Sequence, residues 1–345
     1  MSDLKINNIT DSTGNRGPQI CGVSTVSTTG AFVVPVGPTE FRGGRGRGVF
    51  GGGNTLPAMS NSIEYITIAT TGNSTDFGDI SNPETYQAAS ASSTRGILAS
   101  GNNLSPSYSN RIDYVTISSK GGGSDFGDLI TSMYSATGLG DSVRGFVVGG
   151  DISPNGNINV IQYVTMASVG NATDFGDMTE PKRSTYACAS PTRGIIAGGY
   201  NHPLNVKIIE KFTMASTGNT TQFGNLITVI RDGVGLSNST RGIFAGGTTG
   251  TNTNVIQYIT IATDGDATDF GDMSSARYSL GGCASPTRGI IAGGYLSPAV
   301  YKTIEYVNIA STANVVDFGD LIAGKYGIGG FSDVHGGLGL SLIHI

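Results

Sequence analysis

The sequence contains no tryptophan, only three histidines and three cysteines, and only 13% of its 345 residues are charged. The odd number of cysteines, none of them in a C-x-x-C spacing, excludes a zinc knuckle and argues against a disulfide framework. No apolar run approaches the ~20 residues of a membrane helix. The N-terminus, MSDLKINNITDSTG, has no apolar core of the kind that marks a secretory signal peptide. We therefore expect no signal peptide, no membrane insertion, no metal and no cofactor.

Positive charge is also scarce, since the formal net charge is −5. The stretch FRGGRGRG, with Arg42, Arg45 and Arg47, is similar to an RNA-binding Arg-Gly segment. Neutralising phosphates requires a more extended cluster of basic residues than these three. Nucleic acid is therefore not expected as a partner.

Glycine, in contrast, is abundant, with 54 residues. It does not occupy every third position and proline is scarce, so collagen is excluded. Short β-branched runs alternate with glycine-rich turns, which predicts an all-β protein.

The motif Asp-Phe-Gly-Asp explains much of this pattern. Asp-Phe-Gly also carries the magnesium-binding aspartate of protein kinases, but a kinase has one copy, and here six copies lie 47–49 residues apart. The copies begin at Asp76, Asp125, Asp174, Gln222, Asp269 and Asp317. The copy at Gln222 reads QFGN, so only the aromatic residue and the glycine persist in all six. Packing by the phenylalanines and a turn at the glycines, with the aspartates bonding backbone amides, is therefore the expected role. The phenylalanines are Phe77, Phe126, Phe175, Phe223, Phe270 and Phe318.

Two further elements share this period. Arg-Gly pairs open apolar runs that end in glycine, and about 17 residues later comes an element such as IQYVTMA from Ile161. The Arg-Gly pairs begin at Arg47, Arg95, Arg144, Arg193, Arg241 and Arg288. We expect these arginines to occupy equivalent places in a ring and to bind backbone carbonyls or a nearby Asp. A looser element precedes each pair, which makes four β-segments in each repeat. Four strands in 40–50 residues are typical of a β-propeller blade.

The run RGIIAGGY…IEYVNIA…DFGDL…KY resembles the kelch repeat. In kelch repeats a Gly-Gly pair ends the second strand, an aromatic residue lies in the third, and a basic residue follows the fourth. Candidates for that basic residue are Lys182, Arg183, Arg231, Arg277 and Lys325, and the phenylalanine of Asp-Phe-Gly-Asp stands near the place of the family's tryptophan. The resemblance implies a kelch-like β-propeller over residues 38–339. The glycine-asparagine pattern of the alternative RCC1-type propeller is not visible.

The ends of the chain leave the number of blades open. YGIGGFS, from Tyr326, supplies either the innermost strand of blade one, which gives six blades, or the start of a seventh; we favour six. Residues 1–37 lack the repeat and are expected to form an extended docking segment, or else a closing strand or arm. LSLIHI, residues 340–345, matches the translation of a transposon-end sequencing adapter and is expected to be a scar of metagenomic sequencing.

Two functional hypotheses remain. The repeats resemble virion structural proteins of tailed bacteriophages, which implies a non-enzymatic propeller head that is made in the host cytoplasm and resides in the virion. Its N-terminal segment would bind other virion proteins, and its loops a host glycan or protein. The alternative is a carbohydrate-active or oxidising enzyme. A copper site like that of galactose oxidase would need paired Tyr and His ligands, for which the histidines are too few. The main breaks in the repeat lie in or near blade four, at Lys211, Gln222 and the NHPLNVK loop with His202, and they indicate variation in binding loops rather than a catalytic set.

Overall fold

The computed structural model describes residues 46–103, 107–152 and 156–334. The chain divides into two units, Met1–Thr39 and Glu40–Ile345, and every described residue belongs to the second. The predicted docking segment (residues 1–37) and the predicted scar (residues 340–345) lie outside the described residues.

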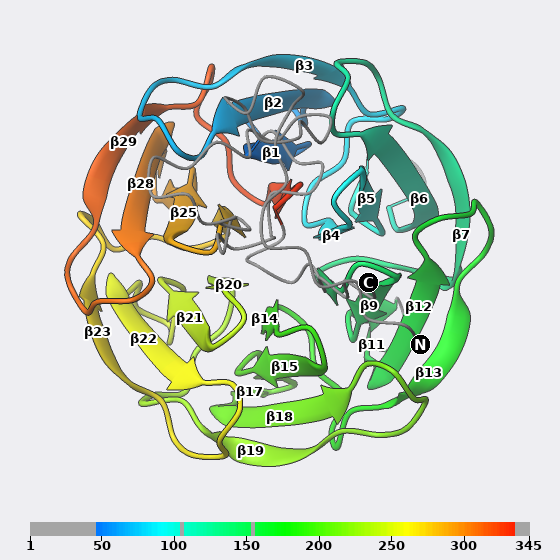
Figure 1. Cartoon of the computed structure of the whole chain (residues 1–345), viewed down its shortest axis with the longest axis vertical. Coiled ribbons are helices and arrows are strands. Elements are labelled where there is room, and N and C mark those ends of the chain that lie inside the picture. The colour runs from blue at the N-terminus through cyan, green and yellow to red at the C-terminus, as the bar shows by residue number, and fades with distance from the viewer. Residues whose placement is uncertain (1–45, 104–106, 153–155, 335–345) are drawn as a thin grey trace, which may run out of the picture. The chain divides into compact units, whose positions relative to one another are not determined.

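The described residues form six four-stranded antiparallel sheets that surround a central axis as the blades of a propeller (Figure 1). The prediction of an all-β propeller with six blades is therefore confirmed. These residues form no helix, and so none long and apolar enough to cross a membrane.

Each blade is described from its innermost to its outermost strand. Blade 1 contains β30 (Gly329–Ser332), β1 (Arg47–Gly51), β2 (Ser62–Thr67) and β3 (Thr75–Asp79). Blade 2 contains β4 (Ala88–Ala91), β5 (Arg95–Ala99), β6 (Ser109–Thr116) and β7 (Ser124–Met133). Blade 3 contains β8 (Thr137–Gly140), β9 (Arg144–Val148), β12 (Val160–Thr165) and β13 (Thr173–Asp177). Blade 4 contains β14 (Tyr186–Ala189), β15 (Arg193–Ala197), β18 (Ile208–Thr213) and β19 (Thr221–Asn225).

The last two blades follow the same order. Blade 5 contains β20 (Val234–Ser237), β21 (Arg241–Ala245), β22 (Val255–Thr260) and β23 (Thr268–Asp272). Blade 6 contains β24 (Gly281–Ala284), β25 (Arg288–Ala292), β28 (Thr303–Asn308) and β29 (Val316–Asp320).

Blade 1 closes the ring because it combines strands from two distant parts of the chain. Strand β30 pairs antiparallel with β1, so that Phe331 lies opposite Val49 and Gly329 opposite Gly51. The YGIGGFS stretch therefore supplies the innermost strand of blade 1, as predicted, and begins no seventh blade. All four strands of this blade lie within the described residues.

Small residues line the axis because the inner strands approach one another closely. A Cβ atom at Gly138 would lie 2.3 Å from the carbonyl oxygen of Ala89 in the neighbouring blade. A Cβ at Gly330 would likewise lie 2.4 Å from the carbonyl oxygen of Gly282. Any side chain there would push two blades apart, which explains the Gly-rich and Ala-rich inner strands.

A stack of Arg, Tyr and Phe lies in five of the six blades. In blade 3 the Arg144 guanidinium lies 5.0 Å from the Tyr163 ring centroid, and that ring meets Phe175 edge-on at 5.8 Å. All six phenylalanines of the Asp-Phe-Gly motif are buried, with 2–4% exposed. The core clusters join neighbouring blades, as where Phe146 and Phe175 pack against Phe212.

The arginines also join each blade to the next one. Every Nη1 donates a hydrogen bond of 2.6–3.0 Å to a carbonyl just beyond the third strand of the following blade. The six pairs are Arg47 with Ile117, Arg95 with Met166, Arg144 with Met214, Arg193 with Ile261, Arg241 with Ile309, and Arg288 with Ile68. The acceptors are thus backbone carbonyls, the first of the two expected alternatives, and no carboxylate of an Asp-Phe-Gly-Asp motif is among them.

The prediction of a turn at Asp-Phe-Gly-Asp was also wrong, because the motif lies inside the outermost strand. Its glycine lies at a β-bulge, as at Gly176, where a Cβ would lie 2.4 Å from the carbonyl oxygen of Gly218 in the next blade. The backbone amide of the following aspartate is a donor: Asp177 N binds Asn219 Oδ1 at 3.0 Å. The motif is thus a contact between blades made through its backbone, which explains why Gln222 and Asn225 are tolerated.

A buried polar residue in each third strand makes another such contact. It accepts a hydrogen bond of 2.8–3.3 Å from a backbone amide of the preceding blade's exit segment. The six acceptors, all at most 4% exposed, are Glu64, Asp113, Gln162, Glu210, Gln257 and Glu305. The donors are the amides of Ile322, Ser81, Ile130, Thr179, Ile227 and Ser274.

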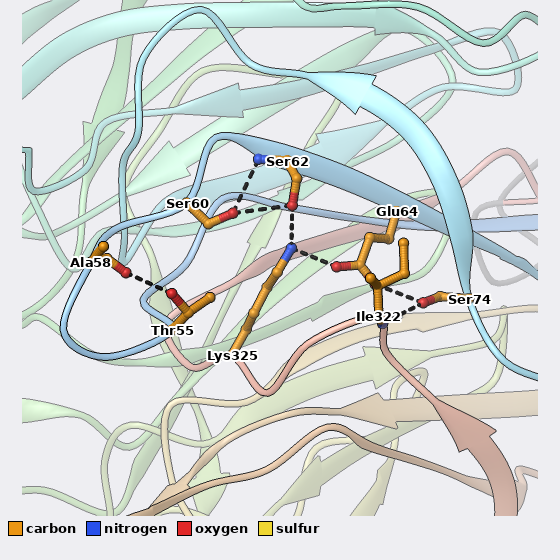
Figure 2. A network of polar contacts seen from close by, with 8 residues as sticks. All are labelled: Thr55, Ala58, Ser60, Ser62, Glu64, Ser74, Ile322 and Lys325. Atoms are coloured by element: carbon orange, nitrogen blue, oxygen red, sulfur yellow. Dashed lines mark hydrogen bonds and ion pairs between the residues drawn. The ribbon is translucent and has the colours of Figure 1, made fainter.

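The charge of this acceptor is complementary to that of a second residue, which belongs to the preceding blade. Three buried glutamates pair with buried cations at 2.6–2.7 Å: Glu64 with Lys325, Glu210 with Lys182, and Glu305 with Arg277. Figure 2 shows Lys325 Nζ between Glu64 and Ser62. Where the acceptor is the neutral Gln162 or Gln257, the repeat position of the cation holds Met133 or Ile230.

The junction between blades 1 and 2 departs from this rule, because Glu84 occupies the position of the cation opposite Asp113. Asp113 is neutralised by Arg111 of its own strand, with Nε 2.9 Å from Oδ1. Glu84 is 3% exposed, and Gln87 Nε2 donates to its carboxylate at 3.0 Å. Burial, aided by the charge of Asp113, raises the pKa of Glu84 above its usual range.

The paired junctions predict a compensating double substitution. Lys182→Met alone should lower the free energy of unfolding by about 3–5 kcal/mol, because it leaves the Glu210 charge buried without its partner. Adding Glu210→Gln should restore most of the loss, since the pair then reproduces Met133 and Gln162. Urea denaturation measures both changes, with Lys207→Met at an exposed site as the control. A double variant no more stable than Lys182→Met would contradict this account.

The Glu84 junction predicts a stability that depends on pH. Because the pKa of Glu84 is higher in the folded protein than in the unfolded chain, the folded protein holds this proton more tightly. Glu84 therefore lowers the free energy of unfolding as the pH rises above the unfolded-state pKa near 4.5. Glu84→Gln should therefore raise the melting temperature more at pH 8 than at pH 4. Thermal unfolding of both proteins at the two pH values tests this. Asp174→Asn, at an exposed carboxylate, should show no such difference.

Candidate ligand-binding face

One end of the propeller carries six loops that connect the second and third strands. In blade 4 strand β15 ends at Ala197, and Gly198 and Gly199 follow with φ of +60° and +105°, which turns the chain out of the sheet. Three of these loops form short hairpins. Their strands are β10 (Asp151–Ile152) with β11 (Gly156–Asn157), β16 (Tyr200–Asn201) with β17 (Leu204–Asn205), and β26 (Tyr295–Leu296) with β27 (Ala299–Val300). The repeat arginines begin the second strands and therefore lie at the opposite end of the blades.

Two positions of the repeat meet at the base of each loop. In each blade, a residue shortly before the innermost strand forms a β-bridge with a residue of the loop. That second residue directly follows the Gly-Gly pair, or its equivalent, at the end of the second strand. The six bridges join Asn54 with Tyr326, Thr85 with Asn102, Tyr134 with Asp151, Arg183 with Tyr200, Arg231 with Thr248, and Tyr278 with Tyr295. These residues vary from blade to blade, and many of them are tyrosine or arginine.

The first stretch of side chains on this face runs from blade 2 to blade 5. Tyr108 stacks on Tyr134 with ring centroids 4.8 Å apart and planes 8° apart. The Arg183 guanidinium lies 5.6 Å from the Tyr134 centroid and 5.1 Å from that of Tyr200. The Arg231 guanidinium lies 4.5 Å from the same Tyr200 centroid. Rings and guanidinium planes thus form a continuous series.

The second stretch runs from blade 6 to blade 2. Tyr278 meets Tyr295 edge-on at 5.6 Å, Tyr295 meets Tyr326 at 5.1 Å, and Tyr326 meets Tyr86 at 6.2 Å. The side chains of both stretches are all partly exposed. We call them together the aromatic arc: Tyr86, Tyr108, Tyr134, Arg183, Tyr200, Arg231, Tyr278, Tyr295 and Tyr326.

Polar contacts hold the arc in place. Arg183 Nη1 donates to the Tyr134 hydroxyl at 2.6 Å and forms an ion pair with Asp151 at 2.5 Å. The Tyr200 hydroxyl lies 3.0 Å from Nδ1 of His202. Burial raises the pKa of Tyr134 and of Tyr278, so these hydroxyls keep their protons and can donate as well as accept hydrogen bonds.

Inside the arc, six residues form a closed ring of backbone hydrogen bonds around the axis. Each directly follows the bridge residue that precedes an innermost strand, and each has φ between +54° and +64°. Its backbone amide donates a hydrogen bond of 2.6–3.3 Å to the carbonyl of the equivalent residue of the preceding blade. In ring order they are Tyr86, Ser135, Ser184, Asp232, Ser279 and Gly327. The ring fixes where their side chains stand at the mouth of the axis, although the left-handed backbone costs non-glycine residues about 1–3 kcal/mol each.

The two residues predicted as binding variation lie at opposite ends of the propeller. His202 lies on the loop of β16 and β17, next to the arc. Lys211 replaces the third-strand tyrosine of the other blades, and its ammonium pairs with Asp264 of blade 5. Arg193 Nη1 lies 3.6 Å from the same carboxylate. Asp264 thus balances two adjacent cations, and Lys211 belongs with the repeat arginines rather than with the loops.

The kelch-type basic residues fall into two classes that the sequence analysis did not separate. Lys182, Arg277 and Lys325 are buried at the junctions, whereas Arg183 and Arg231 belong to the arc. The arc tyrosines were missed as a group. The available signal was that aromatic and basic residues cluster at two repeat positions, one shortly before the innermost strand and one directly after the Gly-Gly pair.

Comparison of the sequence with protein families and with curated proteins does not indicate a function. No protein-family model matches the sequence, and no curated protein matches it either. Within the described residues no group of three or more His, Cys, Asp or Glu side chains is placed to hold a metal ion. Cys188 and Cys283 are buried without a disulfide, and burial raises the pKa of both thiols.

Proposed function

We propose that the protein is a non-enzymatic binding head of a phage virion, and that the aromatic arc binds a glycan of the host surface. The observation that carries this proposal is the difference between the two ends of the blades. At one end the arginines repeat in every blade and bind carbonyls of the next blade. At the other end the bridge positions vary and expose tyrosine and arginine, residues that dominate binding hot spots.

The chemistry of the arc suits a sugar. Tyrosine offers a rigid apolar ring to the C–H face of a pyranose and a hydroxyl at its rim. Planar polar groups beside the rings can form hydrogen bonds with the hydroxyls of a sugar. The side chains of Arg183, Asp151 and Asn201 supply such groups. Tyr200 lies between Arg183 and Arg231, so one ring and two donor groups face the same region.

The proposed lack of catalysis has separate support. Hydrolysis of a glycoside usually requires an acid and a base, most often two carboxyl groups. Two carboxylates on this face, Asp151 and Asp232, each lie beside an arginine, at 2.5 Å from Arg183 and 3.3 Å from Arg231. The virion assignment rests on the resemblance of the repeats to phage structural proteins, and the kelch relationship rests on the same kind of resemblance.

A binding assay with matched variants tests the role of the arc. Tyr200→Thr and Tyr295→Thr introduce the residue that blade 5 carries at the same position, Thr248, so both variants should fold. On an array of bacterial surface glycans we expect the double variant to lose at least about tenfold in affinity, about 1.4 kcal/mol. Mass spectrometry of the bound glycans should show no cleavage.

Lys211→Tyr serves as the matched control at the other end of the blades, because it restores the tyrosine of the repeat. It should leave binding unchanged. Loss of binding in Lys211→Tyr but not in the double variant would place the site at the arginine end. Failure of the wild type to bind any glycan, together with binding to host surface protein, would replace the glycan by a protein target.

Attachment to the virion is assigned to residues 1–37, as a separate part of the proposal. The ring from β1 to β30 has all four strands of blade 1 without them. Deleting residues 1–37 should therefore leave a folded propeller with an unchanged melting temperature that no longer associates with virion particles in co-sedimentation. A propeller that unfolds on deletion would make this segment part of the fold and remove the support for docking.

A further inference from the structure

The hydrogen-bonded ring departs from serine at three positions, Tyr86, Asp232 and Gly327, of which the first two lie opposite each other. Serine occupies three of the six places, at Ser135, Ser184 and Ser279. Tyr86 and Asp232 are three steps apart in a ring of six, so they face each other across the axis. A bulky residue such as Tyr86 with φ of +59° is a conformational outlier, and such outliers cluster at functional sites.

Tyr86 reaches across the axis rather than away from it. Its neighbour in the ring is Gly327, the one place without a side chain, where a Cβ would lie 3.4 Å from the Tyr86 ring. The Tyr86 phenol interacts with the side chains of Ser279 and Asp232. These two residues are the next positions of the ring after Gly327. Burial raises the pKa of this phenol, so it stays neutral.

A cavity of about 120 Å³ lies at this place on the axis. Residues of all six inner strands line it, and they include Tyr86, Ser135, Ser184, Asp232 and Ser279. Asp232 is the only charged residue in this lining. Ser279 is 6% exposed, and its hydroxyl makes no hydrogen bond of normal geometry. The cavity thus contains one negative charge and a buried hydroxyl that lies beside the Tyr86 phenol.

We propose that this cavity is a subsite for an organic ammonium group, held by Asp232 and the Ser279 hydroxyl beside the Tyr86 phenol. It deepens the proposed function, on which it rests, because it places an amine, such as that of an amino sugar, at the end of the bound ligand.

The size and the charge of the cavity support this ligand class. A cavity of ~150 Å³ takes a molecule as large as benzene, so 120 Å³ suits an end group of a few heavy atoms rather than a whole sugar. Burial raises the pKa of Asp232 although Ser184, Arg231 and Arg183 act in the opposite direction, so a further cation beside the carboxylate would offset part of the cost of its burial. A carboxylate offers about four acceptor sites, and Arg231 and Ser184 engage only part of them.

The hydroxyl groups and the acid would act together on such a group. An ammonium donates hydrogen bonds to the Asp232 carboxylate and to the oxygens of Ser279 and Tyr86. A neutral ligand of the same shape would not gain the ion pair. Preference for the charged group is therefore the property that the site should show.

The test uses propylammonium chloride and its neutral counterpart 1-propanol, titrated against the full chain at constant ionic strength and followed by saturation-transfer NMR. The wild type should bind propylammonium saturably and at least about tenfold more tightly than propanol. Asp232→Ser should abolish that preference without lowering the melting temperature, because serine occupies three equivalent places in the ring. Asp232→Asn, which keeps the shape of the side chain, should lose the preference as well.

Equal affinity for the two probes in the wild type, or an unchanged preference in Asp232→Ser, would overturn the inference. Neither result touches the glycan proposal, which the Tyr200→Thr and Tyr295→Thr variants test independently of Asp232. Competition by the trimer of glucosamine, but not by its N-acetylated form, would support the site and identify the source of the amine as a sugar. Competition by a lysine peptide alone would support the site and identify a protein source.

Discussion

The pairing of β1 with β30 is the constraint on which the rest of the propeller depends. It joins residues separated by most of the chain, and it makes blade 1 equivalent to the other five. Once the ring is closed, every blade has a neighbour on both sides, and each contact between blades can be made six times. The ion pair of Lys325 with Glu64 joins blade 6 to blade 1, as the equivalent ion pairs join blade 3 to blade 4 and blade 5 to blade 6.

Three kinds of contact then hold the blades in order: the arginine bonds to carbonyls, the backbone bonds of the Asp-Phe-Gly-Asp motif, and the buried acceptors of the third strands. The first two are nearly uniform around the ring. The third varies in charge, because a buried glutamate needs a cation while a buried glutamine does not. The acceptor and the residue opposite it are therefore matched in charge at the three glutamate junctions and the two glutamine junctions.

Rigidity at the junctions leaves the loop end free to vary. Tyrosine and arginine accumulate there at positions whose backbone is fixed by β-bridges, and the inner ring holds six side chains around the axis. Departures from the repeat are informative in both places, but they differ in kind. Lys211 is compensated by Asp264 within the structure, whereas Asp232 and Tyr86 face a cavity.

The sequence by itself determined the repeat, the four strands of each blade and the buried phenylalanines, because these follow from local pattern and period. It left the closing strand as one of two alternatives, which the pairing of β30 with β1 decided. It did not determine which residues of different repeats meet. The exchange of Lys182 for Met133 beside Glu210 or Gln162 is visible in the sequence only once the junction is known. The arc and the ring around the axis were decided by the tertiary structure alone, because closure brings together six segments about 48 residues apart and so makes neighbours of Tyr86, Ser279 and Asp232.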